Sequence, residues 1–145
     1  PMAELEWHSD WFMIHVIAAR RGICFIPAAL GFLRINDEGS YSSGSSRWES
    51  QKDVMKTLFR LLFSERFIDV VPFFEEANVM SVLASDVSRL LIEEPDFWTE
   101  DAVRSVIAML EPSQQRDLLG PLNARQDMYR NFSNICKDIL ASEGS

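Results

Sequence analysis

The first apolar segment of the chain, residues 9–21, is hydrophobic on nearly every side. This pattern predicts a helix that is buried on more than one face. Ser9 suits the capping position through its hydroxyl, and Asp10 suits the positive end of the helix dipole. Two arginines followed by Gly22 are typical of a helix end. From the residues alone, Asp10 therefore favours a structural role at the start of a helix.

Two short apolar runs after this helix predict strands. Residues 23–26 are rich in β-branched and aromatic side chains, and Pro27 removes a ladder donor at their end. Residues 30–35 form a second candidate strand, followed by turn residues. A serine-rich loop around Tyr41 closes the segment, and we place a domain boundary after residue 46.

From residue 47 onward the hydrophobic positions follow the period of helices. Thr99 is suited to cap one of these helices, and Pro95 prevents the preceding helix from continuing. The predicted helical segments are 48–63, 64–74 with an interruption at Pro72, 79–92, 99–110, a short turn at 112–119 before the Gly120-Pro121 break, and a last helix over 122–140.

These elements predict a mainly α fold with two parts. Residues 1–46 would form an α-β-β segment, and residues 47–145 would form a bundle of about five helices. The chain has 145 residues, of which 47% are hydrophobic, which is ample material for a core.

Charge and hydropathy argue against nucleic-acid binding and against a membrane-spanning segment. The net charge is −8, and no basic cluster interrupts it, so we expect no nucleic-acid binding. No apolar run approaches the roughly 18 residues that span a bilayer, and no signal peptide is recognisable. We therefore expect a protein of the cytoplasm, either free or peripheral to a membrane.

The cysteines and histidines do not form a metal-binding pattern. Cys24 and Cys136 stand far apart within apolar segments, which predicts two buried free thiols. His8 and His15 are seven residues apart and have no third ligand in register. We expect one capping histidine and one core histidine.

The first 45 residues contain a series of short motifs. They are Trp7-His8-Ser9-Asp10-Trp11-Phe12, His15-Val16, Ala18-Ala19-Arg20-Arg21-Gly22, Cys24-Phe25-Ile26-Pro27 and Leu30-Gly31-Phe32-Leu33-Arg34. Their ordered combination resembles the closing segment of a family 2 glycosyltransferase catalytic domain. In that family an acidic-aromatic step opens a helix that ends in glycine, and two strands and an arginine-bearing loop follow. The resemblance implies that residues 1–46 are the end of a nucleotide-diphospho-sugar transferase α/β domain.

The resemblance also implies a reaction: transfer of a sugar, with inversion, from a nucleotide-sugar donor to an acceptor hydroxyl. The family's catalytic base falls on Asp10. A hydroxyl is a poor nucleophile until a carboxylate within hydrogen-bond reach takes its proton. Trp11, Arg34 and Tyr41 are the implied substrate-binding residues.

A divalent metal, Mg²⁺ or Mn²⁺, is implied for the full-length enzyme because the diphosphate leaving group needs charge neutralisation. The family's Asp-x-Asp and nucleotide-binding strands lie upstream of the matched segment. Two positions depart from the family pattern: Ser9 replaces a common acid, and Asn36 replaces a frequent metal-contacting histidine. We expect no cofactor in this chain alone.

These implications lead us to expect the C-terminal part of a bacterial-type glycosyltransferase, inactive in isolation because the donor site is missing. The alternative is a non-enzymatic helical module for protein interaction or dimerisation. A helix that is apolar all round also predicts self-association through the first 45 residues, which would hide Phe12, Ile14 and Ile17.

Overall fold

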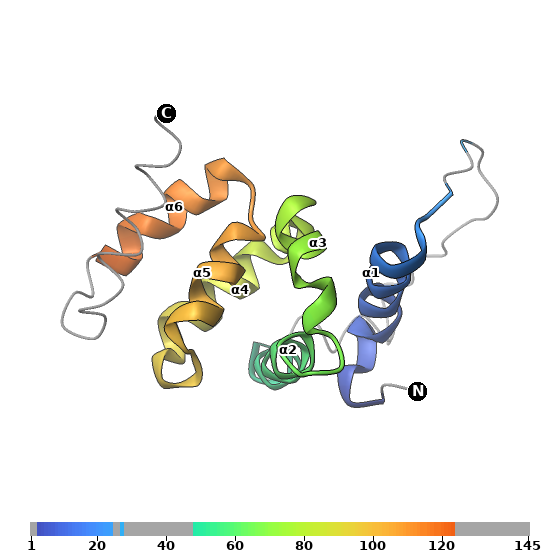
Figure 1. Ribbon diagram of the computed structural model, residues 1–145. Coiled ribbons are helices and arrows are strands. Elements are labelled where there is room, and N and C mark those ends of the chain that lie inside the picture. The colour runs from blue at the N-terminus through green and yellow to red at the C-terminus, as the bar shows by residue number, and fades with distance from the viewer. Residues whose placement is uncertain (1–2, 25–26, 28–47, 124–145) are drawn as a thin grey trace. The chain divides into compact units, whose positions relative to one another are not determined.

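The computed structural model describes residues 3–24, 27 and 48–123. Within these ranges every regular element is a helix (Figure 1). The chain divides into two compact units, an N-terminal unit, Pro1–Val70, and a C-terminal unit, Val71–Ser145. The mainly α class is thus confirmed for the described part of the chain, whereas the α-β-β arrangement is not shown.

The described part of the N-terminal unit contains two α-helices and two 3₁₀ segments. Helix α1 packs against both 3₁₀ segments, and α2 packs against the first of them. The elements are η1 (Ala3–His8), α1 (Ser9–Arg21), α2 (Trp48–Leu62) and η3 (Ile68–Val70).

Helix α1 begins and ends where the sequence pattern predicts. Gly22 has a φ of 79° and donates its backbone N–H to the Ala18 carbonyl at 2.8 Å, which closes the last turn. The capping role predicted for Ser9 is wrong, because its hydroxyl donates to the Glu6 carbonyl at 2.9 Å instead of capping the helix. Glu6 has a φ of 42°, so the chain kinks sharply just before the helix and brings this carbonyl within reach.

The prediction that α1 is buried on more than one face is wrong for the folded chain. Phe12 and Val16 are buried, but Ile14 and Ile17 are 54% and 53% exposed. The packed elements η1 and η3 cover one side of the helix, and the side bearing the two isoleucines faces solvent.

Helix α2 follows its predicted stripe closely. Its buried residues recur at spacings of three and four, as expected for a helix with one face toward a core. Among the described residues of the N-terminal unit, the buried apolar side chains are those of Leu5, Phe12, Val16, Val54, Met55, Leu58, Phe59, Leu62, Phe67 and Val70.

The segment after α1 departs from two predictions. Ile23 and Cys24 have no regular structure and are exposed, Ile23 to 74%. Cys24 is therefore a free but exposed thiol, not a buried one, because the chain leaves the helix at Gly22 and runs into solvent. The predicted strand at 30–35 and Cys136 lie outside the described residues.

The C-terminal unit is helical throughout its described part. Helix α3 packs against η4 and α5, and α4 packs against η4, η5 and α6. The elements are α3 (Val71–Glu76), η4 (Val79–Leu83), α4 (Ala84–Glu93), η5 (Pro95–Phe97), α5 (Glu100–Ala108) and α6 (Pro112–Asn123).

Thr99 caps α5 as predicted, because its hydroxyl oxygen accepts the Ala102 N–H at 3.2 Å. The predictions at proline residues were less accurate. Pro72 lies in the first turn of α3, where its missing N–H costs nothing, so it does not interrupt a helix. Pro121 lies inside α6, which continues to Asn123 through the expected break.

Backbone and side-chain hydrogen bonds join η4 to the end of α5. The Met80 N–H donates to the Met109 carbonyl at 3.1 Å. Ser81 accepts the Glu111 N–H on its hydroxyl at 2.9 Å and the Gln114 side-chain amide on its carbonyl at 3.1 Å. These contacts fix the turn that leads into α6.

The predicted boundary after residue 46 falls within 28–47, which lies outside the described residues, and it stays a prediction. Helix α2, on its far side, belongs to the same compact unit as α1.

Candidate functional site

Asp10, the predicted base, is the second residue of α1, and its side chain is exposed. Its carboxylate lies in the first turn, where the positive end of the helix dipole favours a negative charge. Trp11 follows it and is half-buried. The structure therefore brings these two predicted site residues to the start of one helix. Arg34, Asn36 and Tyr41 lie outside the described residues.

Aromatic and histidine rings surround the start of α1. The centroids of Trp7 and His8 lie 6.4 Å apart, and those of His8 and Trp11 lie 6.2 Å apart, both edge to face. The Trp11 and His15 rings are tilted against one another at 4.6 Å. His15 Nδ1 lies 2.7 Å from the Trp11 carbonyl oxygen, which can only accept, so Nδ1 carries the proton.

A buried chain of hydrogen bonds ties the residue before α1 to α2. The Trp7 indole N–H donates to Gln51 Oε1 at 2.6 Å, and Gln51 Nε2 lies 2.9 Å from His8 Nε2. An indole N–H only donates, so the Gln51 oxygen must face Trp7 and its amide nitrogen must face His8. His8 Nε2 therefore accepts, which leaves that nitrogen without a proton. Gln51 is 2% exposed and His8 is 8% exposed, so the bond between them is shielded from water, whereas the Trp7–Gln51 bond is partly buried.

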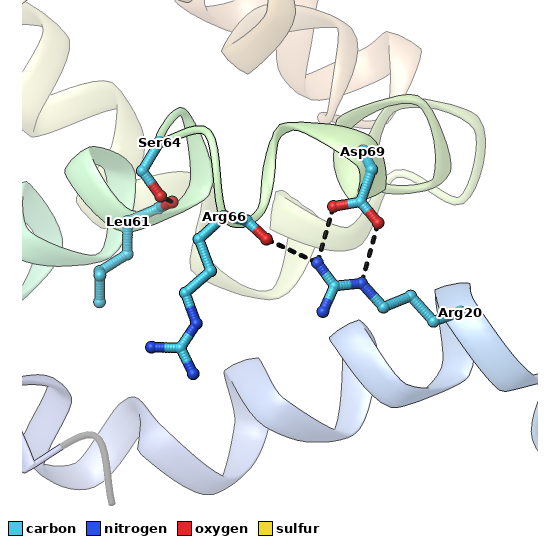
Figure 2. Close-up of polar contacts among 5 residues, drawn as sticks. All are labelled: Arg20, Leu61, Ser64, Arg66 and Asp69. Carbon is cyan, nitrogen blue, oxygen red and sulfur yellow. Dashed lines mark hydrogen bonds and ion pairs between the residues drawn. The ribbon is translucent and has the colours of Figure 1, made fainter.

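The other end of α1 is held by an ion pair. Arg20 donates through Nε to Asp69 Oδ2 at 2.8 Å and through a terminal nitrogen to Asp69 Oδ1 at 2.7 Å (Figure 2). The same terminal nitrogen donates to the Arg66 backbone carbonyl at 2.6 Å. The hydrogen bond from Arg20 lowers the pKa of Asp69, and Asp69 raises the pKa of Arg20 in return. The pair is partly exposed, so solvent screens it.

Phe67 forms the apolar part of the same contact. The Arg20 and Arg66 guanidinium carbons lie 5.4 and 5.0 Å from the Phe67 ring centroid, within cation–π distance. On α1, the Phe12 ring meets Phe67 edge to face at 5.3 Å. Phe67 thus joins the charged end of α1 to its buried face.

The described residues do not supply a metal site. Across residues 3–24, 27 and 48–123, no three His, Cys, Asp or Glu side chains come together in a way that could hold an ion. His8 and His15 are engaged with Gln51 and a backbone carbonyl, respectively. The donor set needed for Mg²⁺ or Mn²⁺ is thus not formed in this part of the chain.

Two residues that fix α1 were not singled out as site residues by sequence reasoning. Gln51 had a usable signal, because a polar residue in the apolar stripe of a predicted helix must be buried with a partner. Asp69 had none, because its partner Arg20 lies 49 residues away and no local pattern links the two.

No family model, curated protein or solved structure matches this chain. The resemblance to family 2 glycosyltransferases therefore stays a prediction. Nor does any helix in the described part of the chain have the length and apolar character needed to cross a membrane.

Proposed function

We propose that this chain is the C-terminal part of a family 2-like glycosyltransferase, in which Asp10 acts as the general base. The observation that carries the proposal is the position of the Asp10 carboxylate, exposed in the first turn of α1 beside Trp11. A base must reach the proton it removes, and an exposed carboxylate on a fixed helix meets that requirement.

The proposed reaction is a single inverting displacement. The acceptor hydroxyl oxygen attacks the anomeric carbon of the donor sugar as Asp10 takes the hydroxyl proton. The bond from that carbon to the diphosphate breaks, and the nucleoside diphosphate leaves with the bonding electrons. A divalent metal would neutralise the leaving diphosphate. The described residues do not fit such an ion, so the proposal assigns it to the rest of the longer enzyme.

The contacts at both ends of α1 support this role for Asp10. The Trp7–Gln51–His8 bonds fix the residue two positions before Asp10, and the Arg20–Asp69 pair fixes the far end of the helix. Catalytic groups work best on elements whose geometry is held by packing and second hydrogen bonds.

Substitution of Asp10 in the full-length enzyme tests the proposal. Asp10→Asn keeps the shape of the side chain but removes the base, so we expect kcat to fall about 10²- to 10⁴-fold. Binding of the nucleotide-sugar donor, measured by calorimetry, should stay unchanged. Asp53→Asn is the matched control, because Asp53 is an exposed aspartate on α2. Full turnover by Asp10→Asn would remove Asp10 from this role.

The isolated 145-residue chain gives an independent test. The proposal puts the donor site upstream, so titration with nucleotide sugars and Mn²⁺ should give no measurable heat of binding. Tight binding would contradict the assignment of the chain as a part that lacks the donor site.

A second candidate is a non-enzymatic interaction module. It is favoured by one observation, the exposure of Ile14 and Ile17 on the solvent face of α1. Exposed apolar side chains that share one helix face can contribute to a contact surface.

A further inference from the structure

Helix α1 presents one continuous face to solvent. Asp10 and Arg21 are exposed at its two ends, and Ile14 and Ile17 lie between them, each more than half exposed. The spacings of four, three and four residues place all four side chains within an arc of about 60°. The buried Phe12 and Val16 lie on the opposite side of the helix. We call the four exposed residues the α1 face.

The order of residues along the α1 face is self-complementary. Asp10 and Arg21 are equally distant from the midpoint between residues 15 and 16, and so are Ile14 and Ile17. If a second α1 lies antiparallel across a twofold axis at that midpoint, Asp10 of one copy meets Arg21 of the other. Ile14 then meets Ile17, and the same contacts repeat on the other side of the axis.

We propose that the α1 face binds the α1 face of a second copy of this chain in this antiparallel register. A parallel pair would bring aspartate opposite aspartate and arginine opposite arginine, and each like-charge contact is unfavourable. The antiparallel pair satisfies both charges and removes four isoleucine side chains from water. Charge complementarity therefore selects both the partner and its direction.

This inference gives the second candidate function its partner, and it does not rest on the proposed sugar transfer. The two uses of α1 exclude one another at Asp10, because a carboxylate paired with Arg21 of another copy is not free to take a proton. A dimer formed in this way would be inactive in transfer.

The contact is small. Helix α1 has 13 residues, which corresponds to a length of about 20 Å. An interface of this size falls below the standard range for stable complexes, and the net charge of −8 on each copy adds repulsion. We expect a dissociation constant between about 1 µM and 1 mM.

Two single charge reversals, studied separately and then mixed, test the register. Asp10→Lys alone puts lysine opposite Arg21 twice, and Arg21→Glu alone puts glutamate opposite Asp10 twice, so each variant should be monomeric. In a mixture, the introduced lysine meets the introduced glutamate at one end of the heterodimer. At its other end the unchanged Asp10 and Arg21 meet, so both contacts are complementary.

Sedimentation velocity should therefore show dimer only when the two variants are mixed. Mixtures that stay monomeric while the unchanged chain dimerises would overturn the antiparallel register.

Two variants that replace an exposed apolar side chain by glutamate test whether the α1 face is the interface. Ile17→Glu places a charge opposite Ile14 of the other copy, and we expect at least a tenfold weaker dimer. Val82→Glu is the control, because Val82 is 75% exposed in the C-terminal unit and carries the same charge change. Equal dimerisation of all three chains would show that the α1 face is not the interface, and an unchanged chain that is monomeric at 1 mM would overturn the inference. Circular dichroism confirms that each variant keeps its helices.

These outcomes are separable from those of the catalytic test. If Asp10 is the base but no dimer forms, Asp10→Asn loses turnover, and Arg21→Glu behaves as the unchanged chain does in sedimentation. If the dimer forms and Asp10 has no catalytic role, the mixed variants pair and Asp10→Asn keeps any turnover of the full-length enzyme.

Discussion

Helices α1 and α2 belong to one compact unit, yet they are held in different ways. Helix α2 buries a full stripe of side chains from Gln51 to Leu62. Helix α1 buries Phe12 and Val16 and is fixed near its ends by polar contacts through His8 and Arg20. A helix held at its two ends can leave one long side uncovered, and in α1 that side carries two isoleucines.

The difference shows that apolar content and burial are separate properties of a helix. Most residues of α1 are apolar, which predicts burial on more than one face, but among the described residues the elements that pack against α1 cover one side. The regular spacing of apolar residues in α2 identifies one face of that helix, and this face is the one that is buried. An exposed apolar side on a fixed helix is then available to a partner or to the rest of a longer protein.

The largest expected effect is the difference in unfolding free energy between truncating a buried side chain of α1 and truncating an exposed one. Phe12→Ala should lower the free energy of unfolding by about 3–5 kcal/mol, because it removes a buried ring from Phe67. Ile17→Ala should change it by no more than about 0.5 kcal/mol. Urea unfolding at dilute, monomeric concentration measures both, with Leu58→Ala of α2 as a core reference at about 2–5 kcal/mol. If Ile17→Ala costs as much as Phe12→Ala, the α1 face is covered within the folded chain.

Much of the fold could be predicted from local patterns. The start and end of α1, the stripe of α2 and the Thr99 cap all depend on residues within a few positions of one another, and the structure confirms them. The exposure of Ile14 could not be predicted, because it depends on which elements pack nearby. Helix α6 includes Gly120 and Pro121, so the break expected from these two residues is not seen within the described part of the chain.

The candidate site likewise contains features that the local sequence predicts and features that it does not. Asp10 could be located as a helix-start residue from its own segment. The contacts that hold α1 could not, because Gln51 reaches His8 across 43 residues and Asp69 reaches Arg20 across 49. Contacts of this range depend on the packing of α2 and η3 against the N-terminal segment, which a single sequence does not specify.

The next effect in size concerns the polar contact between η1, which leads into α1, and helix α2. Gln51→Leu removes the acceptor of the Trp7 indole N–H and the donor to His8 Nε2 in a buried position. We expect a loss of about 1–3 kcal/mol in the free energy of unfolding, because the desolvated polar groups lose these partners. Met55→Leu on the same helix is the control, since a swap of similar volume should cost less than about 1.5 kcal/mol. A stability equal to that of the unchanged chain would mean that α1 does not depend on this bond.

The smallest effect should come from the ion pair at the other end of α1, and it should depend on pH. Arg20 lowers the pKa of Asp69 in the folded state, so folding favours the ionised carboxylate. The stabilisation is present above the unfolded aspartate pKa of about 3.9 and is lost as the pH falls through the lower folded value. The melting temperature of the unchanged chain should therefore exceed that of Asp69→Asn at pH 7, and the difference should shrink at pH 3.

A second background isolates the pair from every other group that titrates in acid. In Arg20→Gln, the effect of Asp69→Asn on the melting temperature should depend much less on pH, because the largest cause of the lowered Asp69 pKa is gone. Added salt should reduce the pH 7 difference in the unchanged background, since both partners are partly exposed. A pH-dependent difference that persists without Arg20 would assign the lowered pKa of Asp69 to another cause.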